Sequence, residues 1–532
     1  MDRRAFLIAA GRVGLAAGAG ALGLAVSRTL SPLSVARPRP ISATAAQASP
    51  VPGLVGARSA PSTTVVHDDN AIRQENALRG TDRWLIGGLP ATIEGYLNRA
   101  SAMPGETLSV HVASPTTFDI EWYRLGWYGG VGGRLVRVDP GLPARPGQAP
   151  QLDLPTGRAE APWDASLELQ VPADWPTGMY TAVLRPLAGN PGYAPCIVKR
   201  APGSPAPVLF VSAALTWQAY NTWGGANLYD ASMADSPEIS RGRRAVQVSF
   251  DRPYALRQGA GYQQRWELQF VRWQEREGID VDYAADFDLE LDPGILSDRR
   301  LIVFAGHHEY WSRPMRDVLE AAVASGTNVL FLSANEVYWQ VRLEASPLGL
   351  ARRVTCYKST RLDPVALTHP ELTTCRWRER PVNDPEAPLI GQMYGHIVRR
   401  PGDWIAAGTD HWLYEGTGLR DGDRLVNLVG QEYDSYFPDL GHPGTVILAR
   451  SPVDAVIQSD QLTGRYSSPP LHTATMYTAN SGATVFAAGT FQWSWAIDRF
   501  GDRSYRGAAT PYDERVVRMT QNLFDRLGGS AG

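Results

Sequence analysis

The chain has 532 residues, with 51 basic and 54 acidic side chains and a formal net charge of -3 at pH 7. A chain of this length can bury a large core, and its length predicts two domains after an N-terminal leader. Basic side chains form no tract beyond that leader. We therefore expect no nucleic acid among the partners of this protein.

The first residues carry the pattern of an export signal. Arg3-Arg4 followed by Phe6-Leu7 resembles the twin-arginine motif, a Gly/Ala/Leu run continues to Val26, and an Ala-x-Ala cleavage site follows at Ala46-Gln47-Ala48. We expect residues 1–48 to be a cleaved Tat-type signal peptide that exports the protein to the periplasm or the extracellular space. The alternative is an uncleaved membrane anchor, which a run so rich in Gly and Ala favours less.

Two stretches of different character follow the signal. Residues 49–85 are rich in Pro, Ser, Ala and Thr, which predicts a flexible approach. Residues 86–200 show short alternating runs separated by turn residues, and this pattern predicts an antiparallel β-sandwich of immunoglobulin-like type. We expect the aromatic residues of this domain to fill its core. The alternative is a carbohydrate-binding surface built from Trp122, Trp127 and Tyr128.

Residues 201–530 have a different hydrophobic pattern, in which short apolar runs alternate with helical stretches. The clearest of these lie at 208–212, 262–277, 300–304, 328–332 and 511–527. Their alternation predicts an α/β domain with a mainly parallel sheet. Between about 345 and 480 the signals are irregular, and we expect insertions over the edge of the sheet.

The cysteines and serines argue against several kinds of site. Cys196, Cys356 and Cys375 are too few for a disulfide scaffold, although Cys356 and Cys375 could pair in an oxidising compartment. No Cys/His spacing typical of structural zinc is present. None of the cysteines follows a strand directly before a helix, and there is no Gly-x-Ser-x-Gly motif, so a covalent acyl-enzyme is not supported.

The stretch at 301–326 organises the second domain. A short apolar run is followed by Pro314, apolar residues at helical spacing and a final glycine, which predicts strand, turn and helix. His307, His308 and Glu309 therefore lie at the carboxyl end of a buried strand, where ligands bind in open α/β sheets. The alternative, in which these polar groups only support the turn, fits one such residue better than three in a row.

Other polar loops follow predicted strands of the same domain. Tyr220 comes after the first strand, Tyr254 lies in the loop region beyond it, and Asn335 follows the strand at 328–332. If the sheet is parallel, Tyr220, Glu309 and Asn335 emerge at one edge. Oxygen and imidazole donors without thiolate suit a hard, oxygen-loving metal ion better than structural zinc.

Six motifs occur in order along the chain. They are Tyr-Arg-Leu-Gly-Trp-Tyr-Gly-Gly at 123–130, Trp-Gln-Ala-Tyr-Asn at 217–221, Asp-Arg-Pro-Tyr at 251–254, Gly-His-His-Glu-Tyr-Trp-Ser at 306–312, Ser-Ala-Asn-Glu at 333–336 and Gly-Gln-Glu-Tyr-Asp at 430–434. Together they resemble the large subunit of N,N-dimethylformamidase and its relatives. The resemblance runs from about 90 to 530, and the ordered set is far more specific than any one motif.

The resemblance implies a metal site. Members of that family are amidohydrolases with a mononuclear iron held by two tyrosines and one glutamate, on a fold like that of glutamine amidotransferases. Carried onto this chain, the resemblance makes Glu309, Tyr220 and Tyr254 the ligands of an iron ion, with Tyr229 competing with Tyr254 for the second tyrosine position. Phenolate and carboxylate are hard anions that together neutralise Fe(III).

Catalytic residues are implied as well. The family's neighbouring histidine and asparagine fall on His307 and Asn335, and its second glutamate falls on Glu432. In hydrolysis of a small amide, Glu432 would act as general base, and Asn335 and His307 would hydrogen-bond the developing oxyanion. Aromatic residues would line a small apolar pocket, namely Trp217, Tyr310, Trp311 and Phe491.

Two functions from different classes follow from these patterns. The first is an exported, iron-dependent amidohydrolase. The second is a secreted binding protein in which the sandwich recognises a cell-envelope glycan and the α/β domain is inactive. The complete set of ligand residues favours the enzyme. A homo-oligomer and a small partner subunit are both compatible with the sequence, which does not identify the amide.

Overall fold

The computed structural model describes residues 71–86, 90–201, 203, 205–229, 244–255, 261, 263–455 and 470–529. The predicted signal peptide over 1–48 lies outside these residues, and so does most of the predicted approach over 49–85. The described part of that approach includes helix α2 (Ala71–Ala77), whose Ile72 is buried. Among the helices in the described ranges, none is both long and apolar enough to cross a bilayer.

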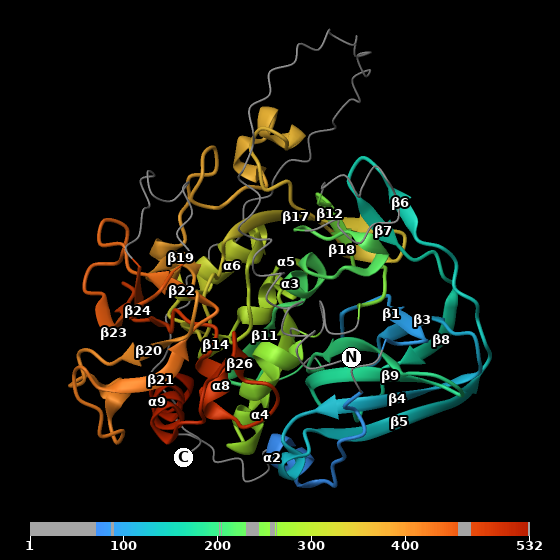
Figure 1. Ribbon diagram of the computed structural model, residues 1–532, viewed down its shortest axis with the longest axis horizontal. Helices are drawn as coiled ribbons and strands as arrows, with labels where there is room; N and C mark the ends of the chain where they lie inside the picture. The colour runs from blue at the N-terminus through green and yellow to red at the C-terminus, as the bar shows by residue number, and fades with distance from the viewer. Residues whose placement is uncertain are drawn as a thin grey trace.

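Two sheets form the N-terminal part, drawn blue to teal in Figure 1. Their strands pair antiparallel, except that β2 runs parallel to β10. The smaller sheet has the order β1 (Glu94–Leu97), β3 (Thr107–Ala113), β8 (Ala165–Gln170). The larger sheet has the order β2 (Ser101–Ala102), β10 (Gly192–Val198), β9 (Gly178–Pro186), β4 (Phe118–Leu125), β5 (Gly133–Leu142). A separate pair consists of β6 (Gln151–Asp153) and β7 (Arg158–Glu160).

One apolar core draws on both of these sheets. Val110 of β3 and Leu169 of β8 are buried in one cluster with Ile120 and Trp122 of β4. Successive side chains of a strand point to opposite faces, so the apolar set of each strand can share the inner face. Trp122 is fully buried and donates to Asp139 at 3.0 Å. The prediction that Trp122 packs in the core is confirmed. Because it is fully buried, Trp122 is not part of a surface that could bind a glycan.

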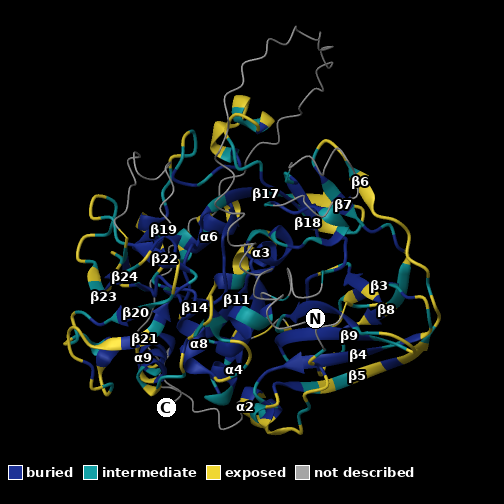
Figure 2. Cartoon of the chain, viewed as in Figure 1, coloured by how far each residue is buried: buried dark blue, intermediate teal, exposed yellow. Residues whose placement is uncertain are grey.

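A seven-stranded sheet runs through the other part of the molecule (Figure 1). Its order is β13 (Val281–Ala285), β11 (Val208–Ser212), β14 (Leu301–Phe304), β16 (Asn328–Phe331), β25 (Thr484–Ala487), β24 (Leu471–Thr478), β23 (Val446–Pro452). The first five strands are parallel, and the last two pair antiparallel. Strands β11 and β14 are buried along their whole length (Figure 2), and so is β13. Such burial is expected for parallel strands covered on both faces.

Helices connect these strands and fix their loops. Helix α6 (Arg313–Ala324) begins where the Ser312 hydroxyl accepts a hydrogen bond from the Met315 amide at 3.3 Å, so the predicted strand, turn and helix are confirmed. The stretch predicted over 262–277 contains one π-helical turn (Gln263–Glu267) followed by α4 (Leu268–Arg276). The other α-helices are α3 (Ala214–Ala219), α5 (Asp288–Leu291), α7 (Ala387–Ile390), α8 (Trp493–Ile497) and α9 (Glu514–Phe524).

The region with irregular sequence signals contributes further strands. A four-stranded sheet has the order β12 (Gln247–Ser249), β18 (Gly349–Thr355), β17 (Trp339–Ser346), β15 (Tyr310–Ser312). Three short antiparallel pairs are β19 (Met393–Ile397) with β22 (Glu432–Ser435), β20 (Gly402–Ile405) with β21 (Arg424–Val429), and β26 (Ser504–Tyr505) with β27 (Ala508–Ala509). Cys356 and Cys375 are buried in this region as free thiols.

A buried ion pair joins the N-terminal sheets to the part that carries the large sheet. Arg124 of β4 donates to both carboxylate oxygens of Glu275 on α4, at 2.7 and 2.9 Å, and both side chains are shielded from solvent. Tyr283 of β13 donates to the same carboxylate at 2.6 Å. These contacts fix the two parts against each other, because separating them would leave buried charges unpaired.

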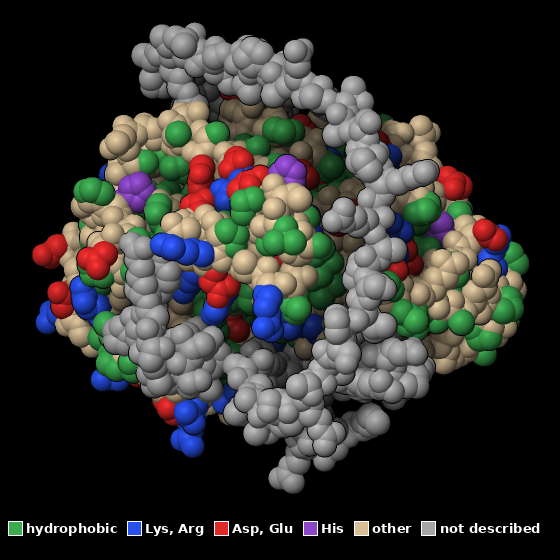
Figure 3. Space-filling view, turned by 90° about the horizontal axis from the view of Figure 1, so that it is seen from above, with side chains coloured by type: hydrophobic (Ala, Val, Ile, Leu, Met, Phe, Trp, Pro, Cys, Tyr) green, Lys and Arg blue, Asp and Glu red, His purple; other side chains and the backbone are tan. Residues whose placement is uncertain are grey.

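The prediction of a mixed fold is confirmed, with many short strands and few helices. The immunoglobulin-like type of the sandwich and the likeness to glutamine amidotransferases stay predictions. Acidic and basic side chains of described residues are interspersed on the face seen in Figure 3. This distribution agrees with the near-balance of 51 basic and 54 acidic side chains.

Candidate functional site

The carboxyl ends of the parallel strands place four loops at one edge of the large sheet. Strand β11 leads through α3 to Tyr220, β14 leads to Glu309, β16 leads to Asn335, and β25 leads to Phe491. Neighbouring parallel strands end at the same edge, so these loops meet there. The expectation that Tyr220, Glu309 and Asn335 emerge at one edge agrees with this topology.

Glu309 is the centre of the site and is 1% exposed. The Tyr220 hydroxyl donates to its Oε2 at 2.8 Å, and the Tyr229 hydroxyl donates to its Oε1. The indole nitrogen of Trp339 also donates to Oε1, at 3.0 Å, and Nε2 of His307 lies 3.2 Å from Oε2. Two phenols, an indole and an imidazole therefore converge on one carboxylate.

The surroundings of Glu309 stabilise its ionised form. Burial alone would raise the pKa of this carboxyl group, but the hydrogen bond and charge of His307, with help from Lys358 and Tyr229, outweigh it and hold the pKa of Glu309 below its usual range. Burial, and then the charge of Glu309, raise the pKa of Tyr229 well above its usual range. In this arrangement the carboxyl group is therefore anionic and the phenol is protonated.

Lys358 is a site residue that the sequence motifs do not include. Its amine lies 3.0 Å from the ring centroid of Tyr229 and donates to the Tyr310 hydroxyl at 2.7 Å. Burial lowers the pKa of this amine to about 7, and the charge of Glu309 opposes that change. Composition offered a signal for it, because lysine occurs at only two positions in the whole chain, 199 and 358.

Glu432 and Asn335 form a second polar pair at this edge. Asn335 Nδ2 donates to Oε2 of Glu432 at 2.8 Å, and burial raises the pKa of Glu432 to about 7. The His307 ring packs on Phe491, with ring centroids 4.4 Å apart. Nδ1 of His307 and Oδ1 of Asn335 are buried without a hydrogen-bond partner among the described residues. Both atoms can therefore still bind a ligand.

The aromatic residues predicted to line a pocket belong to the main core cluster. Tyr310 and Trp311 are fully buried directly after Glu309, and the Trp311 indole donates to the His308 carbonyl at 2.7 Å. Trp217 and Phe491 are buried in the same cluster. Of the four, Phe491 is the one whose ring packs on His307, so it is the aromatic group best placed to contact a ligand bound there.

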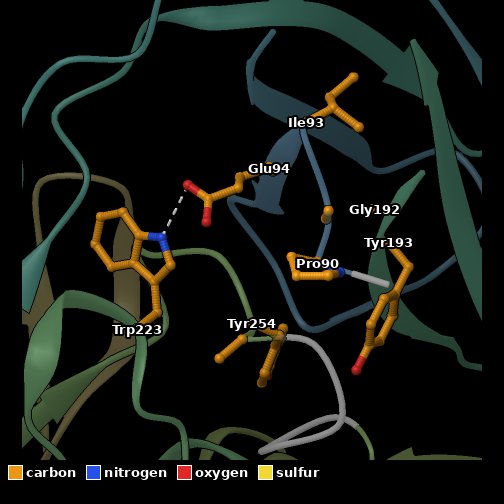
Figure 4. A pocket seen from close by; sticks show the side chains of 10 residues that line it. Pro90, Ile93, Glu94, Gly192, Tyr193, Trp223 and Tyr254 are labelled. Carbon is orange, nitrogen blue, oxygen red and sulfur yellow. Dashed lines mark hydrogen bonds between the residues drawn. The ribbon is translucent and has the colours of Figure 1, made fainter. Parts of the chain in front are cut away.

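Tyr254 lies apart from the contacts of Glu309. It lines a pocket of about 200 Å³. The wall of this pocket also includes Glu94, Tyr193 and Trp223 (Figure 4). The hydroxyl of Tyr254 is buried without a hydrogen-bond partner among the described residues, and burial raises the pKa of this phenol. None of the residues around Glu309 lines this pocket. The structure therefore brings Tyr229, not Tyr254, onto the Glu309 carboxylate.

The donor set around Glu309 fits a hard trivalent metal ion. Within the described part of the chain, no three His, Cys, Asp or Glu side chains form a group suited to a metal ion. Phenols are a different kind of donor, and those of Tyr220 and Tyr229 both meet the Glu309 carboxylate. A cation that displaced their protons would find three hard oxygen donors without thiolate, which suits iron in its trivalent form.

Fold and site together define a β-rich protein of mixed architecture with a buried oxygen-donor cluster at the carboxyl edge of its main sheet. A family model described as N,N-dimethylformamidase beta subunit-like, C-terminal, matches residues 119–507. The chain belongs to this family, and the resemblance read from its motifs is confirmed. The matched range contains every candidate site residue, namely Tyr220, Tyr229, Tyr254, His307, Glu309, Asn335 and Glu432.

Two curated relatives are both named N,N-dimethylformamidase beta subunit. The one from Alcaligenes sp. is 23% identical over 444 residues, which cover 69% of this chain and 54% of the relative. The one from Paracoccus aminophilus is 23% identical over 312 residues, which cover 50% of this chain and 38% of the relative. The matches thus span about half the length of the first relative and less of the second.

A solved structure gives a weaker likeness. It is a Paenibacillus sp. cycloisomaltooligosaccharide glucanotransferase complexed with cycloisomaltoheptaose, 11% identical, and the match covers 36% of this chain and 27% of that one. Its TM-score is 0.14, which is too low to bear on the fold or function of this protein.

Proposed function

We propose that this protein hydrolyses the C–N bond of a small amide and that it depends on a mononuclear iron, as an N,N-dimethylformamidase-like hydrolase. The observation that carries the proposal is the convergence of two phenols on the buried Glu309 carboxylate, at the sheet edge that also holds the Glu432–Asn335 pair. Membership of the family supports it, because the curated relatives are named for this activity.

Glu309 and Tyr220 would hold the iron, together with one further phenol. Tyr254 is the second tyrosine implied by the motifs, whereas Tyr229 is the one in contact with Glu309, and we propose Tyr229 on that geometry. When bound, Fe(III) would supply Lewis acidity toward the amide carbonyl and toward water. The resident anions would balance its charge, since two phenolates and one carboxylate carry three negative charges.

Glu432 would serve as the general base. Its carboxylate would take a proton from water and return it to the leaving amine, and a pKa near 7 suits that exchange at neutral pH. Asn335 Nδ2 donates to Glu432, so we assign Asn335 first to holding the base, which differs from the predicted oxyanion contact. His307 would hydrogen-bond the developing oxyanion, and the Phe491 ring would exclude water beside it.

The two tyrosine assignments can be separated by one pair of variants. Tyr229→Phe removes a phenol that touches Glu309, so we expect iron affinity to fall by roughly a hundredfold or more and the visible tyrosinate-to-iron band to weaken. Tyr254→Phe should keep iron and colour, since the Tyr254 hydroxyl makes no hydrogen bond to Glu309 or to any other described residue. Metal analysis and absorption spectra of the two proteins measure this.

Each of these variants is the matched control of the other, because both remove one hydroxyl from a partly buried tyrosine that packs against the main core cluster. A colourless Tyr254→Phe protein beside an iron-replete Tyr229→Phe protein would reverse the assignment. It would also mean that the loop carrying Tyr254 moves onto Glu309 when iron binds.

Export is a separate proposal that rests on the twin-arginine pattern. We expect Arg3-Arg4→Lys-Lys to leave the protein in the cytoplasm, and the exported wild type to begin near Ser49. Fractionation and N-terminal sequencing measure both. Normal export of the double variant would point to a general secretory signal or an anchor instead.

Partners are proposals too. The curated relatives are named as beta subunits, which supports a small partner subunit, and a homo-oligomer is also consistent with the sequence.

The activity itself is tested by incubating the purified protein, loaded with iron, with a panel of small amides and measuring released amine. Failure to hydrolyse any of them, with or without a co-purifying partner, would contradict the proposed function.

A further inference from the structure

Two acidic residues of strand β22 reach the same neighbour. Glu432 and Asp434 are two residues apart on this strand, so their side chains point to the same face. Asn335 Nδ2 donates to Glu432 Oε2 at 2.8 Å, and the backbone amide of Asn335 donates to Asp434 Oδ1 at 2.9 Å. One asparagine is thus held by two buried carboxyl groups of a single strand.

The backbone of Asn335 needs such support. Its φ is +56°, in the left-handed region that asparagine tolerates better than most residues but still populates sparsely. A buried amide N–H at this position requires an acceptor, and Asp434 provides it. Without that acceptor, the turn would lose the contact that fixes both its backbone and the direction of the Asn335 side chain.

The same turn runs on toward Glu309. The amide of Val337 donates to the His308 carbonyl at 2.9 Å, and the amide of Trp339 donates to the Glu309 carbonyl at 2.8 Å. The segment from Asn335 to Trp339 is therefore fixed by Asp434 at one end and by the Glu309 strand end at the other. A shift of the turn would move the group that holds Glu432.

We propose that Asp434 is a positioning residue for the general base. It accepts the hydrogen bond of the Asn335 backbone amide and thereby fixes the turn at Asn335, whose side chain holds the Glu432 carboxylate. The proposed reaction gives Asp434 no proton to move and no contact with substrate. The inference rests on the proposed function, because it takes Glu432 as the base.

Three variants test this role in the full-length, iron-loaded protein. Asp434→Ala removes the acceptor, and we expect kcat to fall roughly 10- to 100-fold with KM changed less than about threefold, because a small misplacement of a catalytic group has effects of this size. Asp434→Asn keeps an acceptor oxygen and should retain kcat within about fivefold of wild type. In a Glu432→Gln background, Asp434→Ala should cause no further loss.

Asp288 offers the matched control. It is also a buried aspartate that accepts a backbone amide, from Ala285 at 2.8 Å, and its other contacts are with Ser101 and Lys199 of the N-terminal part. Asp288→Ala removes an equivalent acceptor away from Glu432. We expect it to lower the melting temperature as Asp434→Ala does, and to leave kcat unchanged in the folded protein.

The outcomes separate this inference from the proposed function. If Glu432→Gln hydrolyses amides at the wild-type rate, the assignment of the base fails. If Glu432→Gln is slow but Asp434→Ala is as fast as wild type, or lowers kcat by the same factor in the Glu432→Gln background, the positioning role is overturned.

One more variant covers the case in which Asp434→Ala does not fold. Asn335→Gly suits a positive φ and removes only the side chain that joins the turn to Glu432. We expect a 10- to 100-fold loss of kcat in this protein as well, and wild-type turnover would overturn the inference.

Discussion

Glu309→Ala is expected to lose both iron and amidase activity. The variant removes the carboxylate on which Tyr220 and Tyr229 converge, and it takes one of three anionic charges from the proposed metal site. We expect iron affinity to fall by several orders of magnitude, the visible band to disappear, and turnover to reach the background rate. Metal analysis, absorption spectra and an amine-release assay on one preparation measure all three.

Glu309→Gln is the control for this prediction. The amide keeps the size of the side chain and one acceptor oxygen, but it removes the negative charge. We expect it to fold like wild type, by melting temperature, and still to lose iron. An iron-replete Glu309→Gln protein with normal colour would show that the carboxylate is not a ligand.

Glu432→Gln is expected to keep iron and colour but to hydrolyse amides slower by roughly two to four orders of magnitude, the usual range for losing a general base. That range corresponds to about 3 to 5 kcal/mol of lost transition-state stabilisation. Asn335 can still donate to the carbonyl oxygen of the glutamine, so the arrangement of this pair should persist. Iron content and kcat, measured on the same sample, give the result.

The pKa of Glu432 also predicts how the hydrolysis rate changes with pH. Burial raises the pKa of Glu432 to about 7, and a base acts in its deprotonated form, so the wild-type rate should fall as the pH drops below about 7. Glu432→Gln should lack this fall of the rate at low pH.

If Glu432→Gln emptied the metal site, Glu432 would have to be a ligand and the roles of the two glutamates would change.

The strand-end residues of the site were predictable from sequence because they follow buried apolar runs. The run before Glu309 is a parallel strand in the middle of the large sheet, and the one before Asn335 is its neighbour. Local patterns therefore placed both residues at one edge. The metal-binding and catalytic roles of the site residues stay predictions.

Lys358 lies outside every sequence motif, and Tyr229 was identified from sequence only as the competitor of Tyr254. Neither follows a strand of the large sheet, and each meets Glu309 or Tyr310 through the folding of a long connection. Their approach depends on tertiary packing over many residues, for which no local period or motif exists. For Lys358 the rare usage of lysine was the one sign, and it does not say where a side chain points.

Some parts of the fold follow from local sequence patterns and others depend on tertiary packing. Strands β11 and β14 lie within the predicted runs because continuous apolar segments are typical of buried parallel strands. The amphipathic pattern over 262–277 does not separate α4 from the π-helical turn that precedes it. At this junction the buried Glu267 side chain accepts no hydrogen bond from the amides of α4 and instead accepts one from the Trp217 indole at 2.8 Å. That contact comes from α3, 50 residues earlier in the chain, so no local pattern could predict it.

If the cluster around Glu309 binds iron and this iron supports amide hydrolysis, iron content and activity must rise together. Iron content and amine release, measured together on wild-type protein loaded with graded amounts of iron, test it most directly. We predict a tyrosinate-to-iron band and a turnover rate that rise together and saturate when each chain holds its iron. Full turnover by colourless, iron-free protein would contradict the account.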